Sequence, residues 1–123
     1  MTREALRDSV LVIDDDADCR TLVETIAEIC NTPVLQAPDC REGLEILKRE
    51  HDRIKMIILD YFMPGLEPAE CAQAIVGMAG PSIAVVLLTA SVDAGARAAE
   101  LKINRWISKP FEPSTLINLF TQN

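Results

Sequence analysis

Residues with acidic, hydroxyl and amino side chains follow short apolar runs of this sequence. Asp14 and Asp15 follow one run, Asp60 and Thr89 follow two others, and Lys109 lies just beyond a fourth. Carboxylates that lie close together repel one another, and a hard divalent cation such as Mg²⁺, which prefers oxygen ligands, relieves that repulsion. A carboxylate, a hydroxyl and an ammonium beside such a cation are the groups that phosphoryl transfer uses, and the carboxylate can be the nucleophile.

These side chains can meet only if the apolar runs before them are strands of one sheet. The runs are short, mostly continuous and rich in β-branched residues, which is typical of strands covered on both faces. They occupy residues 9–13, 33–36, 56–59, 83–88 and 105–108. Parallel strands end at the same edge of a sheet, and ligands bind outside those carboxyl ends, so such a sheet would unite the polar residues.

Amphipathic stretches separate the apolar runs and are predicted to be helices. Their apolar residues fall within 19–29, 44–47, 69–79, 93–101 and 116–120. Asp39 with Glu42 resembles a capping box, Gly80 with the following proline breaks the third helix, and Pro113 can start the last one. Strict alternation of strand and helix predicts an α/β fold, a doubly wound five-stranded parallel sheet with right-handed crossovers.

Length and composition limit the classes of protein to which the chain can belong. Its 123 residues suffice for one domain, and no repeat or linker divides residues 1–123. With 12 basic and 19 acidic residues the formal charge is −7, which argues against direct contact with nucleic acid. No apolar run reaches the roughly 18 residues of a membrane span, and residues 1–8 lack the apolar stretch of a signal peptide. We therefore expect a cytoplasmic protein without membrane contact.

The four cysteines do not form a metal-binding pattern. Cys19, Cys30, Cys40 and Cys71 contain no C-x-x-C pair, and the single histidine, His51, is far from them in sequence. Zinc binding is therefore not expected. In the absence of a secretion signal, the cysteines are predicted to be reduced thiols that pack as small apolar residues.

Four motifs together resemble the receiver domain of two-component response regulators, and the likeness covers nearly the whole chain. The motifs are Leu11-Val12-Ile13-Asp14-Asp15, Leu59-Asp60 with Met63-Pro64, Leu88-Thr89-Ala90, and Lys109-Pro110-Phe111. The resemblance implies a flavodoxin-like (βα)5 fold with the strand order 2-1-3-4-5 of the chemotaxis regulators. It also implies a phosphoacceptor domain that is not an enzyme in the usual sense, because it catalyses only its own phosphorylation and dephosphorylation.

The resemblance assigns the metal-binding and phosphorylated residues. It implies that Asp60 is the phosphoacceptor. It further implies that Mg²⁺ is bound by Asp14, Asp15, Asp60 and the backbone carbonyl of Phe62. Asp14 would act largely through water and Asp15 directly.

The resemblance also assigns residues that respond to phosphorylation. Thr89 would hydrogen-bond a phosphoryl oxygen, and Lys109 would pair with the phosphoryl group, or with Asp60 before phosphorylation. Trp106 stands where the family has the aromatic residue that moves inward as Thr89 moves. The bond from Lys109 to the next proline is expected to be cis, and Lys102, in a turn where the family has glycine, is expected to have a positive φ.

The implied partners are proteins. A histidine kinase or a phosphotransfer protein would supply the phosphoryl group, and a downstream protein would contact helix 93–101, strand 105–108 and the last helix of a monomer or weak homodimer. Two alternatives stay open: a receiver that is part of a larger regulator or hybrid kinase, and a phosphorylation-independent adaptor, which would need none of the site residues. Acids in place of a Gly-, Ser- and Thr-rich loop after the first strand argue against a flavin site.

Overall fold

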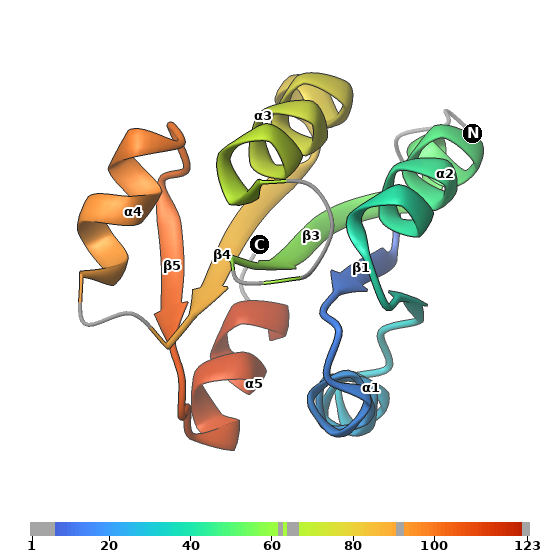
Figure 1. Ribbon diagram of the computed structural model, residues 1–123. Coiled ribbons are helices and arrows are strands. Elements are labelled where there is room, and N and C mark those ends of the chain that lie inside the picture. The colour runs from blue at the N-terminus through green and yellow to red at the C-terminus, as the bar shows by residue number, and fades with distance from the viewer. Residues whose placement is uncertain (1–6, 62, 64–66, 91–92, 122–123) are drawn as a thin grey trace.

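The computed structural model describes residues 7–61, 63, 67–90 and 93–121, which form a five-stranded parallel sheet (Figure 1). The strands are β1 (Ser9–Ile13), β2 (Val34–Ala37), β3 (Ile54–Asp60), β4 (Ala84–Thr89) and β5 (Arg105–Ser108). Neighbouring strands are parallel throughout, in the order β2-β1-β3-β4-β5. The predicted doubly wound sheet and the strand order implied by the resemblance are thus confirmed.

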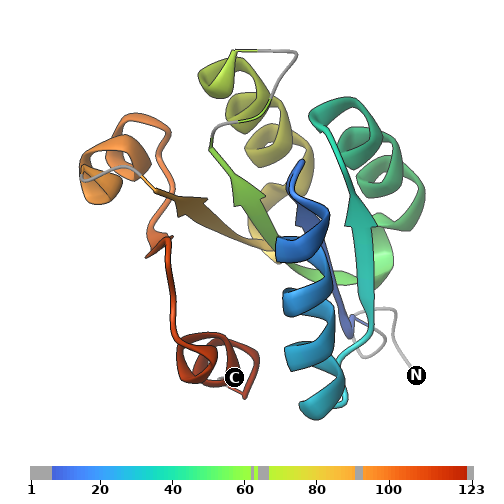
Figure 2. The ribbon, with the colours of Figure 1, turned by 60° about the horizontal axis from the view of Figure 1, so that its bottom comes forward.

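Helices cover both faces of the sheet. They are α1 (Ala17–Ile29), α2 (Cys40–Glu50), α3 (Pro68–Ala79), α4 (Ala94–Glu100) and α5 (Pro113–Thr121), with single 3-10 turns at His51–Arg53 and Gly80–Ser82. The helices α1 and α5 lie on one face, and α2, α3 and α4 lie on the other (Figures 1 and 2). No helix among the described residues is long and apolar enough to cross a membrane.

Strand β1, which lies between β2 and β3, shows why the apolar runs are continuous. Leu11 and Ile13 point to the core shared with α2 and α3, whereas Val10 and Val12 point to the core shared with α1 and α5. All four side chains are fully buried. Because successive strand residues face opposite sides, a strand with helices on both faces needs apolar residues at every position.

Side-chain caps begin two of the helices, and residues with a positive φ follow the last turn of two others. The Asp39 carboxylate accepts a hydrogen bond from the Glu42 backbone N–H at 2.8 Å, as expected for the start of α2. Asp16 caps α1 in the same way, accepting from the backbone N–H of Asp18 at 2.9 Å. Gly80, with φ of 69°, ends α3, and Lys102 has the predicted positive φ, at 59°.

The buried stripe of α1 is narrower than the apolar spacing of its sequence. Val23, Ile26 and Ala27 face the sheet and are almost fully buried. Leu22 and Ile29 leave 42% and 69% of their surface exposed. Since a helix packed on one sheet face buries only one stripe of side chains, apolar residues at the borders of that stripe remain in solvent.

Helix α2 packs unusually close to the end of β1. A Cβ atom at Gly43 would lie 2.5 Å from Cδ1 of Ile13, a distance that real Cβ contacts do not show. Glycine at this position therefore allows α2 to lie directly on Ile13, the residue before Asp14.

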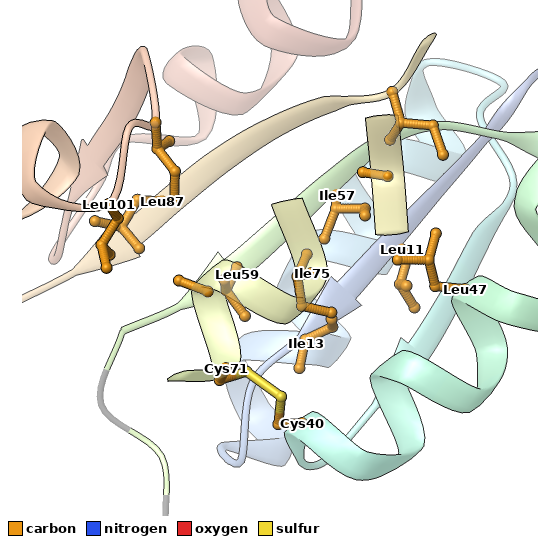
Figure 3. Packing of buried hydrophobic residues seen from close by; sticks show 14 of the residues in the cluster. Leu11, Ile13, Cys40, Leu47, Ile57, Leu59, Cys71, Ile75, Leu87 and Leu101 are labelled. Atoms are coloured by element: carbon orange, nitrogen blue, oxygen red, sulfur yellow. A yellow bond between two sulfur atoms is a disulfide. The ribbon is translucent and has the colours of Figure 1, made fainter. Parts of the chain in front are cut away.

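The structure corrects the prediction that all cysteines are reduced. Cys40, the first residue of α2, forms a disulfide with Cys71 in the first part of α3 (Figure 3). Their Cα atoms are 6.0 Å apart, within the usual range for a bonded pair. Cys19 and Cys30 are free thiols. The pairing could not be predicted from the sequence, because the two residues are 31 positions apart and meet only through the packing of α2 against α3.

Reduction of the Cys40–Cys71 bond is expected to lower the free energy of unfolding by about 3–4 kcal/mol, because the bond closes a loop that otherwise adds entropy to the unfolded chain. Urea unfolding with and without dithiothreitol measures the difference. Cys71→Ala should show a comparable loss and no further response to dithiothreitol, whereas Cys30→Ser should keep the full response. If dithiothreitol did not change the unfolding midpoint of the native protein, the result would contradict this expectation.

Candidate functional site

The sheet brings the predicted site residues together at its carboxyl-terminal edge. Asp14 and Asp15 follow β1, Asp60 ends β3, Thr89 ends β4 and Lys109 follows β5. One carboxylate oxygen from each of the three aspartates lies within 4.8 Å of the other two. Asp14, Asp60 and Thr89 are buried, and Asp15 is exposed. The edge thus combines three carboxylates with an ammonium and lies partly open to solvent.

Lys109 lies between the two buried carboxylates. Its Nζ donates a hydrogen bond to Oδ2 of Asp14 at 3.0 Å and is 3.6 Å from Oδ1 of Asp60. Its backbone N–H donates to the carbonyl of Thr89 at 2.8 Å, and the expected cis bond to Pro110 is present. The ammonium is therefore closer to Asp14 than to Asp60, the partner that the resemblance implied.

Hydrogen bonds keep Asp14 ionised in spite of its burial. Burial disfavours the charged carboxylate, but donors from the Asp16 backbone, the Cys19 thiol and the Lys109 ammonium outweigh that penalty and lower the pKa of Asp14 below its usual value. The Asp16 N–H lies 3.0 Å from Oδ1 of Asp14. Asp14 therefore carries its negative charge at neutral pH.

Asp60 has the opposite electrostatic environment. Burial and the neighbouring charge of Asp14 raise the pKa of Asp60 to about 7, although Lys109 acts against the shift. Asp15 adds a smaller contribution in the same direction as Asp14. One ammonium thus does not compensate the acids gathered here. Such an uncompensated group of carboxylates favours an additional cation.

The donor set fits magnesium. Asp14, Asp15 and Asp60 offer hard carboxylate oxygens close enough to share one ion, and Mg²⁺ binds through a few carboxylates while keeping several waters. The exposed side of Asp15 leaves room for those waters. Phe62, whose backbone carbonyl is the other ligand implied by the resemblance, lies outside the described residues.

Two residues of α1 contact Asp14 although nothing in the sequence singled them out. Burial and a hydrogen bond to Asp14 raise the pKa of the Cys19 thiol to about 12, so Cys19 stays protonated. Arg20 donates from Nη1 to the backbone carbonyl of Asp14 at 2.7 Å and from Nε to Gln36 at 3.2 Å. Only their position in the sequence could have predicted this contact, because the first turn of a helix that follows a strand packs near the end of that strand.

Helix α4 and strand β5 lie beside the site and contact each other. Trp106 of β5 is 49% exposed, and a Cβ atom at Gly95 would lie 3.1 Å from its ring, so the indole rests on α4. The guanidinium carbon of Arg97 in α4 lies 5.8 Å from the centre of the Tyr61 ring, within range of a cation–π contact. Since Tyr61 directly follows Asp60, this contact connects the site to α4.

Comparisons with known proteins identify relatives over nearly the whole chain. A family model described as "Response regulator receiver domain" matches residues 10–121. The "Probable transcriptional regulator ycf27" of Porphyridium aerugineum is 35% identical over 112 residues, which are 89% of this chain and 45% of that protein. An "Uncharacterized 14.6 kDa protein in sodA1 3'region" of Leptolyngbya boryana is 32% identical, over 92% of this chain and 87% of its own. The chain thus spans less than half the length of the ycf27 relative.

Solved structures show the same fold. The chemotaxis protein CheY4 of Vibrio cholerae matches with a TM-score of 0.79 and 25% identity, over 90% of this chain and 93% of its own. A CheY-like response regulator receiver domain protein from Methanospirillum hungatei JF-1 matches with a TM-score of 0.78 and 29% identity, over 92% of this chain and 90% of its own.

Ionisation of Asp60 is expected to destabilise the metal-free protein as the pH rises. The pKa is about 7 in the folded state and 3.8 ordinarily, so the folded state binds more protons between these values. The free energy of unfolding therefore falls with pH over this interval, and the loss is complete above the folded pKa. Asp60→Asn should remove that decline and be more stable than the native protein at about pH 8.

Urea unfolding at about pH 5 and about pH 8, with a chelator present, measures the effect. Asp18→Asn is the matched control, because Asp18 is an exposed acid in the first turn of α1. This control should keep the pH dependence of the native protein. Equal pH dependence in the native protein and in Asp60→Asn would show that the ionisation of Asp60 does not oppose folding.

Proposed function

The chain belongs to the response regulator receiver domain family, and from that premise we propose that it carries a phosphoryl signal on Asp60. A histidine kinase or a phosphotransfer protein supplies the phosphoryl group, and the phosphorylated domain controls a downstream protein. One observation carries the proposal: the buried carboxylate of Asp60 ends β3 beside the Lys109 ammonium and close to Asp14 and Asp15.

Asp60 is the nucleophile in this proposal. One of its oxygens bonds to phosphorus while the bond from phosphorus to the donor's imidazole nitrogen breaks, and the imidazole leaves. In the metal-free protein, burial and Asp14 raise the pKa of Asp60 to about 7, and a cation held beside it would favour the ionised, nucleophilic carboxylate. When bound by Asp14, Asp15 and Asp60, Mg²⁺ supplies positive charge that offsets the oxygens of the transferring group.

Lys109 and Thr89 bind the new phosphoryl group. The ammonium of Lys109 already lies 3.6 Å from Asp60, so it needs only a small shift away from Asp14 to reach a phosphoryl oxygen. Thr89 ends the neighbouring strand β4, and its hydroxyl donates to a second phosphoryl oxygen. Both contacts involve a charged acceptor and are therefore stronger than ordinary hydrogen bonds.

The surface of α4, β5 and α5 transmits the signal. When Thr89 moves towards the phosphoryl group, space opens behind it and the Trp106 ring turns inward from its half-exposed position. Tyr61 and Arg97 couple the same event to α4 through their ring contact. The large apolar indole and the short helix α4 then present a different surface to the downstream protein.

The lengths of the relatives indicate two ways in which a receiver domain could pass its signal on. The ycf27 proteins of Porphyridium aerugineum and Galdieria sulphuraria, named probable transcriptional regulators, are more than twice as long as the matching segment. The protein of Leptolyngbya boryana is matched over 87% of its length. We propose that the receiver controls a protein partner through its surface, and the alternative is a receiver that controls a further part of the same chain.

Acetyl phosphate with Mg²⁺ is expected to add one phosphoryl group to the protein, because Asp60 supplies the nucleophile and the other acids hold the ion. Intact-protein mass spectrometry measures the gain in mass. Addition should fail without Mg²⁺ and in Asp60→Asn. Asp18→Asn should be phosphorylated like the native protein. Uptake by Asp60→Asn at the native rate would overturn the assignment of the phosphoacceptor.

Tryptophan fluorescence should report the switch, since Trp106 is the single tryptophan of the sequence. Beryllofluoride, a mimic of the phosphoryl group, is expected to shift the emission to shorter wavelength as the indole leaves solvent. Thr89→Ala should bind beryllofluoride with a much smaller shift, and Asp60→Asn should show none. An unchanged spectrum in native protein that has bound beryllofluoride would mean that Trp106 does not take part in the switch.

A further inference from the structure

A basic groove lies at the edge of the sheet opposite to the acidic site. It has a volume of about 710 Å³ and is lined by the amino-terminal parts of β3, β4 and β5 and by the last turns of α3 and α5. We propose that this groove binds a small organic anion, a phosphate group attached to an apolar ring-bearing body, as in a nucleoside phosphate. The proposal is independent of phosphorylation at Asp60.

Charge is the first observation in favour of this proposal. Four of the chain's 12 basic residues line the groove, namely Arg7, Lys55, Lys102 and Arg105, and no acidic residue is among its described lining residues. None of the four forms an ion pair with another described residue. In a protein of net charge −7, four cations that have no acidic partner among the described residues favour an anionic ligand in one concave surface.

Arg7 provides the second observation. Its Nη1 donates to the backbone carbonyls of His51 and Ile54 at 2.8 and 3.0 Å, which fixes the guanidinium at the start of β3. Its Nε is buried and has no hydrogen-bond partner within the described ranges. Because Nε is buried, a ligand in the groove does not reach that atom, and Arg7 contributes to the site through the positive charge of its fixed guanidinium.

Lys102 provides the third observation. It lies just after α4 with φ of 59°, a conformation that glycine or asparagine adopts at lower cost than lysine. Its side chain gains no ion pair among the described residues in return, but it does line the groove. Backbone strain of this kind is found more often at functional sites than elsewhere in proteins.

The apolar part of the groove determines the class of ligand. Val76, Val85 and Leu119 line it and are only half-buried, so they present an apolar wall to the groove. The volume lies within the range of about 300–1,000 Å³ that is usual for sites of small organic ligands. Inorganic phosphate would leave this wall in contact with water, whereas a nucleoside would cover it and place its phosphate among the cations.

Calorimetric titration of the full chain with adenosine monophosphate and adenosine triphosphate tests the proposal. Asp60→Asn protein in a chelator is used, so that nucleotide-bound magnesium at the acidic site contributes nothing. Binding is expected, and it should weaken as ionic strength rises. Pyrophosphate and uncharged adenosine should each bind more weakly than the triphosphate. No heat with either nucleotide, or equal affinity for pyrophosphate and the triphosphate, would overturn the proposed class of ligand.

Variants locate the binding. Arg105→Gln and Lys55→Gln should each weaken nucleotide binding by about fivefold, as expected for a partly exposed ion pair. Lys102→Gly should weaken binding while keeping or raising the urea midpoint, because glycine relaxes the backbone. The control Arg41→Gln removes the same charge from the exposed face of α2 and should leave binding unchanged. If Arg41→Gln and Arg105→Gln weakened nucleotide binding equally, the binding would depend on net charge alone, and the proposed site would be wrong.

Discussion

Two buried carboxylates that share one ammonium are the constraint on which much of this structure depends. Ile13 pairs with Leu59 in the register of β1 and β3, so the next residues, Asp14 and Asp60, emerge side by side. Burial of both charges is unfavourable unless each finds compensation. Lys109 provides part of it from the end of β5, and the remaining imbalance appears as the raised pKa of Asp60. The energetic cost of the site is thus built into the register of the central strands.

The sequence predicted those features that follow from local pattern and topology. Continuous apolar runs identified doubly covered strands, and their ends located Asp14, Asp60 and Lys109, because parallel strands share one carboxyl edge. The strand order and the cis bond after Lys109 came instead from the resemblance to a family. The positive φ of Lys102 also depended on that comparison, since no propensity favours lysine in such a turn.

Other features depend on contacts between side chains that no pattern in the sequence records. The disulfide of Cys40 and Cys71 arises where α2 packs against α3. Cys19 appeared as one more apolar position of α1, yet its thiol donates to Asp14. The basic groove joins residues from distant parts of the chain, and only folding reveals that cations gather at one edge and acids at the other. Such charge separation orients charged partners before contact is made.

The Cys40–Cys71 bond also changes how the chain is connected. The backbone between these residues, which contains β3 and Asp60, is closed into a covalent ring. A protease that cuts one peptide bond in this ring opens it without releasing a fragment. The central strand then stays covalently attached on its uncut side, so a nicked domain migrates as an intact chain until a reductant separates its two pieces.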